Sequence, residues 1–308
     1  MQETRAQILE ALSAEPVTGP ELAQQLDVTR AAVWKHIEAL REAGFEISSS
    51  GTGYELVEVP EYGGEAIEFG LEAPFAVEYH DEIGSTNHRA REIATDGNEN
   101  VVVVADKQTG GRGRLNRDWS SPSGGIWLSV LLRPTIPPTH APIVTMAAAV
   151  ATARAVETTG VEPTIKWPND ILVDGKKLTG ILTEMEGEAD RISWLVVGIG
   201  LNANVDKSQL PEDADATSLQ VECGAVDRRH VVKTVLETLS DLLAETDNIL
   251  PAWRSLSGTL GRHVRVETPN GTVTGKAVDV AFPGALIVET DNGTERVTVG
   301  DCEHLRPQ

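Results

Sequence analysis

The sequence predicts an α+β protein built from several domains. Three observations lead to this prediction: capped helical patterns near the N-terminus, strand-like and helix-like stretches that alternate through the middle, and strand alternation with Asn-Gly turns at the end. We place the domains at residues 1–60, 65–255 and 256–308, with a Gly- and Pro-containing linker between the first two. A chain of 308 residues can bury two or three hydrophobic cores.

Residues 1–60 have the pattern of a winged helix-turn-helix. Apolar residues at helical spacing begin at Ile8. Thr18, followed three residues later by Glu21, has the spacing of a capping box for a second helix, and Thr29 can cap a third. Two short alternating strands within residues 45–56 then predict a hairpin, or wing. Helices in this order followed by a wing are typical of DNA-binding modules.

The rest of the chain divides into a mixed part and an all-β part. From residue 65 to 255, apolar strand-like runs interleave with helical patterns, which predicts a mixed α/β domain. After residue 256 the pattern is strand-like throughout, with Asn270-Gly271 and Asn292-Gly293 where hairpin turns are expected. The expected strands are 101–105, 126–132, 194–199, 264–266, 286–288 and 297–299, and the expected helices are 142–159 and 230–250.

Composition and charge exclude several classes of protein. No apolar run is long enough to span a membrane, and no signal segment opens the sequence, so we expect a cytoplasmic protein without a membrane partner. Cys223 and Cys302 are too few for a disulfide framework or a zinc site. The formal charge of −21 comes from 26 basic and 47 acidic residues spread over the chain. Such a surface repels polyanions, and we hypothesise adaptation to concentrated salt.

The most unusual segment spans residues 107–119, Lys-Gln-Thr-Gly-Gly-Arg-Gly-Arg-Leu-Asn-Arg-Asp-Trp. Residues 106–118 hold four basic and two acidic residues, a net charge of +2 inside an acidic protein. Arg112 and Arg114 flank Gly113, which lets the backbone fold closely around a ligand, and guanidinium groups suit a carboxylate or a phosphate. Taken alone, the string fits a solvated basic turn or a nucleic-acid contact equally well.

Four further motifs supply the context that decides between these alternatives. They are Ser85-Thr-Asn87 before the loop, and Lys166-Trp-Pro-Asn-Asp170, Lys177-Leu-Thr-Gly180 and Gly198-Ile-Gly-Leu-Asn202 after it. The ordered set closely resembles the biotin-protein ligase family, specifically its bifunctional members, which carry a DNA-binding domain and repress the biotin operon. The resemblance covers all three parts of the chain.

The resemblance implies a fold and a reaction. The central domain would be related to class II aminoacyl-tRNA synthetases, with a mixed, largely antiparallel sheet covered on one face by helices, and the C-terminal domain would be an SH3-like barrel. In the implied reaction the biotin carboxylate attacks the α-phosphorus of ATP. A lysine of a biotin carboxyl carrier protein then attacks the resulting mixed anhydride.

The resemblance also assigns residues to the biotin site. Lys177 matches the lysine that contacts the biotin carboxylate and the α-phosphate, and it is the main catalytic candidate together with Arg112 and Arg114. Trp127 is a candidate for enclosing the biotin tail. The implied biotin-binding residues are Ser85, Thr86, Asn87, Gln108, Gly111, Arg112, Gly113, Arg114, Lys177 and Gly180.

On the ATP side, Asp170 is the candidate for placing Mg²⁺, an ion that prefers oxygen ligands and bridges phosphates. Asn116 departs from the family pattern, in which many relatives have a further glycine. The glycines of residues 198–200 mimic a dinucleotide fingerprint, but no amphipathic helix follows them, and the sequence has no Walker A loop. The implied ATP-binding residues are Arg117, Lys166, Asn169, Asp170 and Asn202.

Three alternatives remain open. The enzyme could be a lipoate or other acyl ligase that uses the same adenylation chemistry, or the chain could be a transcription factor that only senses biotin. Arg30, Lys35 and Arg41 are expected to contact operator DNA, with a homodimer promoted by the adenylate reading a two-fold site. Residues 1–60 hold only four basic residues against ten acidic ones, so the winged helix could instead be an interaction or dimerisation module.

Overall fold

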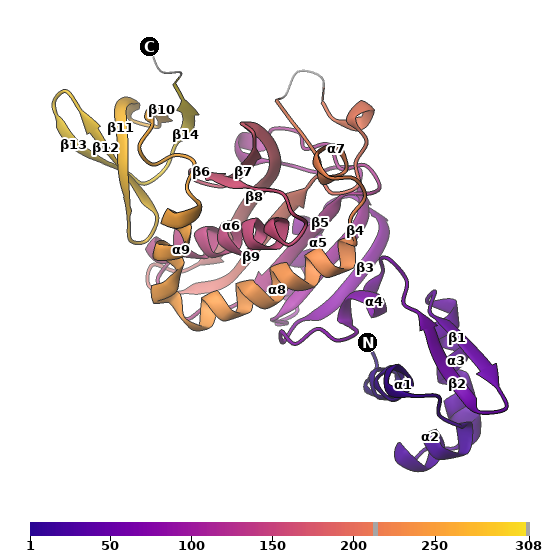
Figure 1. The fold of residues 1–308 in the computed structure, drawn as a ribbon. Coiled ribbons are helices and arrows are strands. Elements are labelled where there is room, and N and C mark those ends of the chain that lie inside the picture. The colour runs from indigo at the N-terminus through magenta and orange to yellow at the C-terminus, as the bar shows by residue number, and fades with distance from the viewer. Residues whose placement is uncertain (212–214, 306–308) are drawn as a thin grey trace. The chain divides into compact units, whose positions relative to one another are not determined.

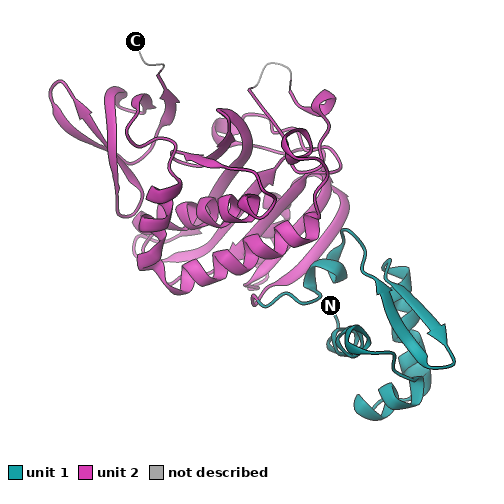
Figure 2. Cartoon of the chain, in the orientation of Figure 1, with its two compact units in different colours: residues 1–72 teal, residues 73–308 magenta. Residues whose placement is uncertain are grey.

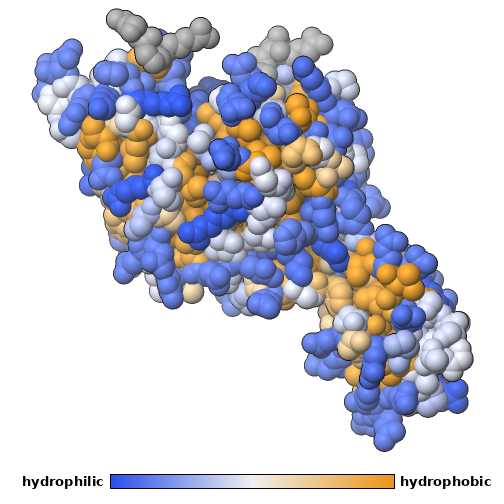
Figure 3. Space-filling view, in the orientation of Figure 1, coloured by the Kyte–Doolittle hydropathy of each residue, from blue (hydrophilic) through white to orange (hydrophobic). Residues whose placement is uncertain are grey.

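The computed structural model describes residues 1–211 and 215–305 of the chain. The chain divides into two compact units, Met1–Glu72 and Ala73–Gln308 (Figure 2). The division falls after Glu72, beyond the linker expected at residues 60–64. Hydrophilic residues cover much of the face of both units that is visible in Figure 3. Within the described ranges, no helix is long and apolar enough to cross a membrane.

The first unit is a winged helix-turn-helix. Its apolar core contains Ile8, Leu22, Ile37 and Phe45, which come from three helices and the wing. The unit extends past residue 60 because Arg5 Nη1 pairs with Glu65 Oε1 at 3.2 Å and ties the first helix to the last. Its elements are α1 (Glu3–Ala14), α2 (Gly19–Gln25), α3 (Arg30–Glu42), β1 (Glu46–Ser50), β2 (Gly53–Glu58) and α4 (Gly64–Glu68).

Both predicted helix caps of this unit are present. The Thr18 hydroxyl accepts from the backbone N–H of Glu21, and the Glu21 carboxylate accepts in return from the backbone N–H of Thr18 at 3.0 Å. Thr29 Oγ1 accepts from the backbone N–H of Ala32 at 3.2 Å. These bonds satisfy N–H groups that a helix start leaves without partners, so α2 and α3 begin where the sequence predicts.

A seven-stranded sheet forms the centre of the second unit, with strand order β3-β4-β5-β9-β8-β7-β6 (Figure 1). Only β3 and β4 run parallel, and all other neighbours are antiparallel. The interior strand β5 is buried along its whole length. The strands are β3 (Ala76–Ile83), β4 (Val101–Gln108), β5 (Ile126–Leu132), β6 (Thr164–Lys166), β7 (Asp170–Val173), β8 (Lys176–Gly187) and β9 (Ile192–Leu201).

Helices lie on both faces of this sheet, and neighbouring residues of β8 show which face each helix covers. Thr183 contacts Thr145 of α6 at 2.7 Å, whereas Glu184 accepts from Asn87 of α5 at 2.7 Å. Because successive strand residues point to opposite faces, α5 and α6 cover opposite faces. Helices α6 and α8 lie side by side (Figure 1). The helices are α5 (Thr86–Thr95), α6 (Pro142–Glu157), α7 (Leu219–Glu222), α8 (Arg228–Ala244) and α9 (Ile249–Leu256).

The C-terminal part is an antiparallel five-stranded sheet with the order β13-β12-β11-β10-β14. The hairpins lie where the sequence predicts them, but each turn begins one residue earlier. Thr268 pairs with Gly271, and Thr290 pairs with Gly293, so the two glycines start β11 and β13. The strands are β10 (His263–Thr268), β11 (Gly271–Ala281), β12 (Ala285–Thr290), β13 (Gly293–Val297) and β14 (Asp301–His304).

The predicted fold class is confirmed, with a helix-turn-helix, a central mixed sheet and a C-terminal antiparallel β domain. Three expectations differ in detail. Helices cover both faces of the central sheet and not one, because α5 and α6 pack on opposite sides of β8. The strand expected over residues 297–299 is β13, which ends at Val297. The helix expected over residues 230–250 ends at Ala244, and the short 3-10 turn Thr246–Asn248 leads into the separate helix α9. The apolar spacing continues through the break, so periodicity alone did not reveal it.

Candidate functional site

The five sequence motifs converge on one cavity of about 900 Å³ in the second unit. It lies on the face of the sheet that α5 crosses, and segments from residue 84 to residue 301 contribute to its wall. Many of the wall residues are those that the sequence predicts. These are Ser85, Thr86, Asn87, Gln108, Arg112, Gly113, Arg114, Arg117, Asn169, Asp170, Lys177, Gly180 and Asn202.

The first turn of α5 forms one end of the cavity. Ser85 is the N-cap residue of this helix, so Thr86 and Asn87 follow in its first turn. The backbone N–H and the hydroxyl of Thr86 donate to Gln108 Oε1, at 2.8 and 3.1 Å. Gln108 Nε2 in turn donates to Ser121 Oγ at 3.1 Å. These bonds fix the orientation of the Gln108 amide and connect α5 to the end of β4.

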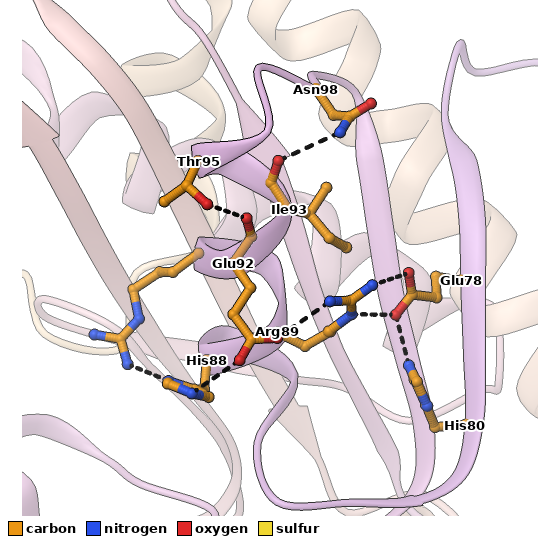
Figure 4. Close-up of polar contacts among 9 residues, drawn as sticks. Glu78, His80, His88, Arg89, Glu92, Ile93, Thr95 and Asn98 are labelled. Atoms are coloured by element: carbon orange, nitrogen blue, oxygen red, sulfur yellow. Dashed lines mark hydrogen bonds and ion pairs between the residues drawn. The ribbon is translucent and has the colours of Figure 1, made fainter.

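An ion pair holds α5 against the edge strand β3, as Figure 4 shows. Arg89 of the helix donates to both oxygens of Glu78, at 2.6 and 3.1 Å. His80 Nε2 lies 2.7 Å from Glu78 Oε1. The hydrogen bond from Arg89 lowers the pKa of Glu78 below its ordinary value. The helix that carries the Ser-Thr-Asn motif is therefore anchored by a charged pair outside the cavity.

The segment of residues 107–119, which we call the arginine loop, contacts the C-terminal sheet. Arg114 Nη1 donates to Asn169 Oδ1 at 2.8 Å, and its Nη2 donates to the Gly300 carbonyl at 2.5 Å. Arg117 Nη2 pairs with Asp301 Oδ2 at 2.7 Å, and Arg114 Nη1 lies 3.6 Å from the other oxygen of Asp301. Arg112 pairs with Asp118 within the loop itself. All three guanidinium groups thus have carboxylate partners, and Asp301 serves two of them.

The backbone of this loop is left-handed at two residues, one of which is Asn116. A short 3-10 turn spans Arg114–Asn116, and Leu115 and Asn116 have φ angles of 55° and 57°. This left-handed region is most accessible to glycine and tolerated by asparagine. Leu115, the other left-handed residue, is 74% exposed. Asn116 therefore keeps the turn that a glycine would make.

Lys177 lies between a carboxylate and an aromatic ring. Its Nζ is 2.7 Å from Asp170 Oδ1 and 5.1 Å from the centre of the Trp119 ring. The indole rests on two glycines, because a Cβ at Gly180 would lie 3.0 Å from the ring and one at Gly200 would lie 2.6 Å from Nε1. A cation over an indole face is attracted by the ring quadrupole, so Trp119 helps to hold the ammonium in the cavity.

Three sequence-predicted residues lie outside the cavity wall. Trp127 is fully buried, and its Nε1 donates to the carbonyls of Asp106 and Pro122 at 3.1 and 2.8 Å, so the assignment to the biotin tail is wrong. Lys166 lies in β6 opposite Asp170 and is not part of the wall. Gly111 sits behind the wall, where a Cβ would lie 2.7 Å from Ser121 Oγ.

Sequence reasoning missed Trp119, Ser129, Glu184 and Asp301. Trp119 ends the arginine loop, and an aromatic residue at the end of this cation-rich segment was a usable signal. The other three come from strands, where the sequence pattern indicates burial or exposure but not the partners of a side chain. Their roles depend on which side chains the fold brings beside them.

In the first unit, α3 exposes two of the three predicted cations. Arg30 and Lys35 are exposed, whereas Arg41 bonds to the Ile47 carbonyl through Nε and Nη2, at 3.0 and 2.6 Å, and to Ser49 Oγ at 2.8 Å. Arg41 therefore fixes the first strand of the wing to α3. Trp34, which the sequence analysis did not single out, is 56% exposed on the same helix.

Comparison with known proteins finds matches in three parts of the chain. Residues 83–202 match the biotin/lipoate A/B protein ligase family, residues 259–305 match the biotin protein ligase C-terminal domain, and residues 4–55 match a helix-turn-helix domain. The bifunctional ligase/repressor BirA of Bacillus subtilis is 39% identical over 305 residues, which cover 94% of each chain. The chain belongs to the biotin protein ligase family.

Other members of the family agree in sequence and in fold. The biotin–[acetyl-CoA-carboxylase] ligase of Mycobacterium tuberculosis is 36% identical over 72% of this chain and 86% of its own. The biotin protein ligase of Aquifex aeolicus, solved in complex with biotin and ATP, superposes with a TM-score of 0.65 at 29% identity. That match covers 75% of this chain and 99% of the Aquifex chain.

The contacts of Asp301 predict that the C-terminal sheet restrains the arginine loop. In the variant Asp301→Ala, we expect trypsin to cleave after Arg112, Arg114 or Arg117 several-fold faster, because local opening of the loop becomes more frequent. Peptide mapping over time measures this. Asp291→Ala, at an exposed hairpin turn, is the matched control. Equal cleavage rates in both variants and the wild type would show that the contact does not restrain the loop.

The Glu78–Arg89 pair predicts a pH-dependent stability. Because the pKa of Glu78 is lowered in the folded state, its contribution is complete above the ordinary glutamate pKa and lost as the pH falls through the folded-state value. Glu78→Gln should therefore cost up to about 1 kcal/mol of unfolding free energy at pH 7. The difference from wild type should shrink below about pH 4.

Thermal unfolding of wild type, Glu78→Gln and the exposed control Glu99→Gln between pH 7 and pH 3 measures this difference. A difference that stays constant over the whole range would rule out the ion pair as its cause.

Proposed function

We propose that this chain is a biotin-protein ligase that activates biotin with ATP and transfers it to a lysine of a biotin carboxyl carrier protein. The observation that supports this most is the convergence of five motifs on one cavity, in a chain 39% identical to a bifunctional ligase/repressor. A structural relative from Aquifex aeolicus was solved with biotin and ATP. The reaction needs no covalent nucleophile, only positioned substrates and stabilised charge.

Biotin would bind with its ureido ring at the α5 end of the cavity. Ser85, Thr86, Asn87 and Gln108 offer hydroxyl and amide groups there, and Thr86 is only 3% exposed. The carboxylate of biotin would then point toward Lys177, beside Gly180 and the glycines of the arginine loop. This orientation places the polar ring against polar side chains and the anion against cations.

Lys177, Arg112 and Arg114 would stabilise the charge that develops in the first step. An oxygen of the biotin carboxylate forms a bond to the α-phosphorus of ATP as the bond to pyrophosphate breaks. Two anions must approach each other, and the ammonium and guanidinium groups lower the cost of that approach. In the second step the acceptor amine attacks the acyl carbon, loses its proton, and AMP leaves.

Arg117, Asn169, Asp170 and Asn202 would face the nucleotide. Mg²⁺ is usually held by one or two carboxylates together with substrate phosphates and water. Asp170 fits that role, because it is a half-buried carboxylate on the cavity wall. Among the described residues there is no cluster of three or more carboxylate, histidine or cysteine ligands, so the protein alone would not enclose an ion. The ion would supply charge neutralisation of the phosphates.

We further propose that the first unit binds operator DNA and places α3 in the major groove. The biotinyl adenylate would promote a homodimer, and the dimer would bind an operator with two-fold symmetry. Residues 4–55 match a helix-turn-helix domain, and Bacillus relatives are named as repressors. Arg30 and Lys35 would contact phosphates or bases. Arg41 would act indirectly by fixing the wing, since its guanidinium is already used within the unit.

The ligase proposal predicts a specific loss of transfer. With biotin, Mg-ATP and a biotin carboxyl carrier domain, wild type should add one biotinyl group to the carrier lysine. Lys177→Ala and Arg112→Ala should be at least about 100-fold slower, because each removes a group that stabilises developing charge. Mass spectrometry of the carrier at low and high salt measures this and tests the proposed salt adaptation.

Lys176→Ala is the matched control, because Lys176 is exposed next to Lys177 and lies outside the cavity wall. It should retain full activity. Tight binding of biotin without transfer at any salt concentration would contradict the proposed ligase activity. The alternative, a repressor that only senses biotin, would then account for the chain.

The DNA proposal predicts a shallow salt dependence, because α3 exposes few cations. DNA duplexes that bind the wild-type protein in the presence of biotin and ATP are first selected from a random library. The affinity of the protein for these duplexes is then measured by fluorescence anisotropy at a series of salt concentrations. Arg30→Ala and Lys35→Ala should each reduce the slope of log K against log [salt] by about 1.

Arg191→Ala, which changes an exposed cation of the second unit, should leave the slope unchanged. Sedimentation of the protein with and without biotin and ATP tests the dimer. If no duplex is enriched under either condition, the first unit is an interaction module and not an operator reader.

A further inference from the structure

A chain of polar side chains crosses the α5 end of the cavity and ends at an acidic residue that no motif includes. Asn87 Nδ2 donates to Glu184 Oε2 at 2.7 Å. On the other side of the same amide, Ser129 Oγ lies 2.6 Å from Asn87 Oδ1 and 2.8 Å from Thr86 Oγ1. Ser129 is fully buried in the interior strand β5, and Glu184 lies on β8. The chain thus joins α5 to two strands of the sheet.

The chemistry of these groups fixes the direction of the hydrogen bonds. A carboxylate can only accept, so Asn87 must turn its NH₂ group toward Glu184. Its carbonyl oxygen then faces Ser129, whose hydroxyl must be the donor in that contact. A flipped amide would place two acceptors opposite each other at Glu184, whereas the Ser129 hydroxyl could accept from the NH₂ group as readily as it donates to the carbonyl oxygen. Glu184 therefore determines which way the Asn87 amide points.

Neighbouring groups hold both Glu184 and Asn87 in place. Arg91 Nη1 pairs with Glu184 Oε1 at 3.2 Å, which leaves Oε2 for Asn87. The second amide hydrogen of Asn87 has the Leu182 carbonyl as an acceptor at 3.4 Å. The carboxamide also lies against Gly198, where any Cβ would overlap Asn87 Oδ1. Both N–H groups of the Asn87 amide are thus directed at protein acceptors. The amide can therefore bind a ligand only through a lone pair on its carbonyl oxygen, as an acceptor.

We infer that Glu184 is a positioning residue that makes this end of the cavity an acceptor surface and so selects an acid whose ring carries N–H donors. The inference rests on the proposed ligase function and adds the basis of its substrate choice. A cyclic urea has two N–H groups to give, whereas a dithiolane ring or a plain alkyl chain has none. A site with buried acceptors discriminates strongly against a ligand that leaves them unpaired.

Exchanging the charged group between the two positions tests the inference. Glu184→Gln can both donate and accept, so it no longer imposes one orientation on Asn87. Asn87→Asp keeps the acceptor but places two carboxylates side by side. The double variant Asn87→Asp with Glu184→Gln keeps one carboxylate, now at position 87, with an amide donor beside it. This pair presents the same acceptor to the ligand as the wild type does.

The rate of adenylation is measured at pH 8 from the release of pyrophosphate. Three acids are compared: biotin, desthiobiotin, which keeps the cyclic urea, and lipoate, which has no ring N–H. Each single variant should raise KM for biotin and desthiobiotin about tenfold and leave kcat within about twofold. The double variant should return KM to within about threefold of wild type. KM for lipoate should change less than twofold in Glu184→Gln.

Glu186→Gln is the matched control, because Glu186 lies two residues along the same strand, is exposed and shares the face of Glu184. It should leave all three KM values unchanged. The inference is overturned if the double variant is as impaired as the single variants combined, or if biotin and lipoate lose affinity in equal proportion. Wild type that turns over neither biotin nor desthiobiotin contradicts the ligase function itself, and the inference with it.

Discussion

The cavity depends on the space that two glycines of strand β9 leave above the sheet. Gly198 and Gly200 lie on the same face, two residues apart, and each receives a side chain from another segment: the amide of Asn87 and the indole of Trp119. β5 and β8 pair with β9 on either side, which places Ser129 and Leu182 opposite Gly198. A larger residue at either glycine would displace one of the two groups that border the ligand space.

The electrostatic state of the cavity follows from pairing within the chain. Lys177, Arg112, Arg114 and Arg117 all have carboxylate partners in Asp170, Asp118 and Asp301. Three carboxylates thus serve four cations, within a chain of net charge −21. An anion that binds to these cations would therefore take the place of a carboxylate of the chain as their partner.

Much of this structure could be predicted from sequence because local rules determine it. The capping signals at Thr18 and Thr29 and the buried run of β5 depend only on near neighbours, and they lie where expected. The ordered motifs likewise identified most of the cavity wall. Trp127 was misassigned because an apolar strand run shows that a residue is buried but not what it packs against. Glu184 and Asp301 could not be found, because their partners lie 97 and 184 residues away along the chain.

The contact between Asp301 and the two arginines makes the C-terminal sheet a part of the cavity wall and not an appended module. Asp301 is the first residue of β14, and Gly300, whose carbonyl accepts from Arg114, immediately precedes it. The length of the connection between β13 and β14 therefore sets the position of both acceptors relative to the loop. Insertions in this turn should be rare among related chains that keep both arginines. Grafting a C-terminal domain from a distant relative would require the loop and the turn to be exchanged together.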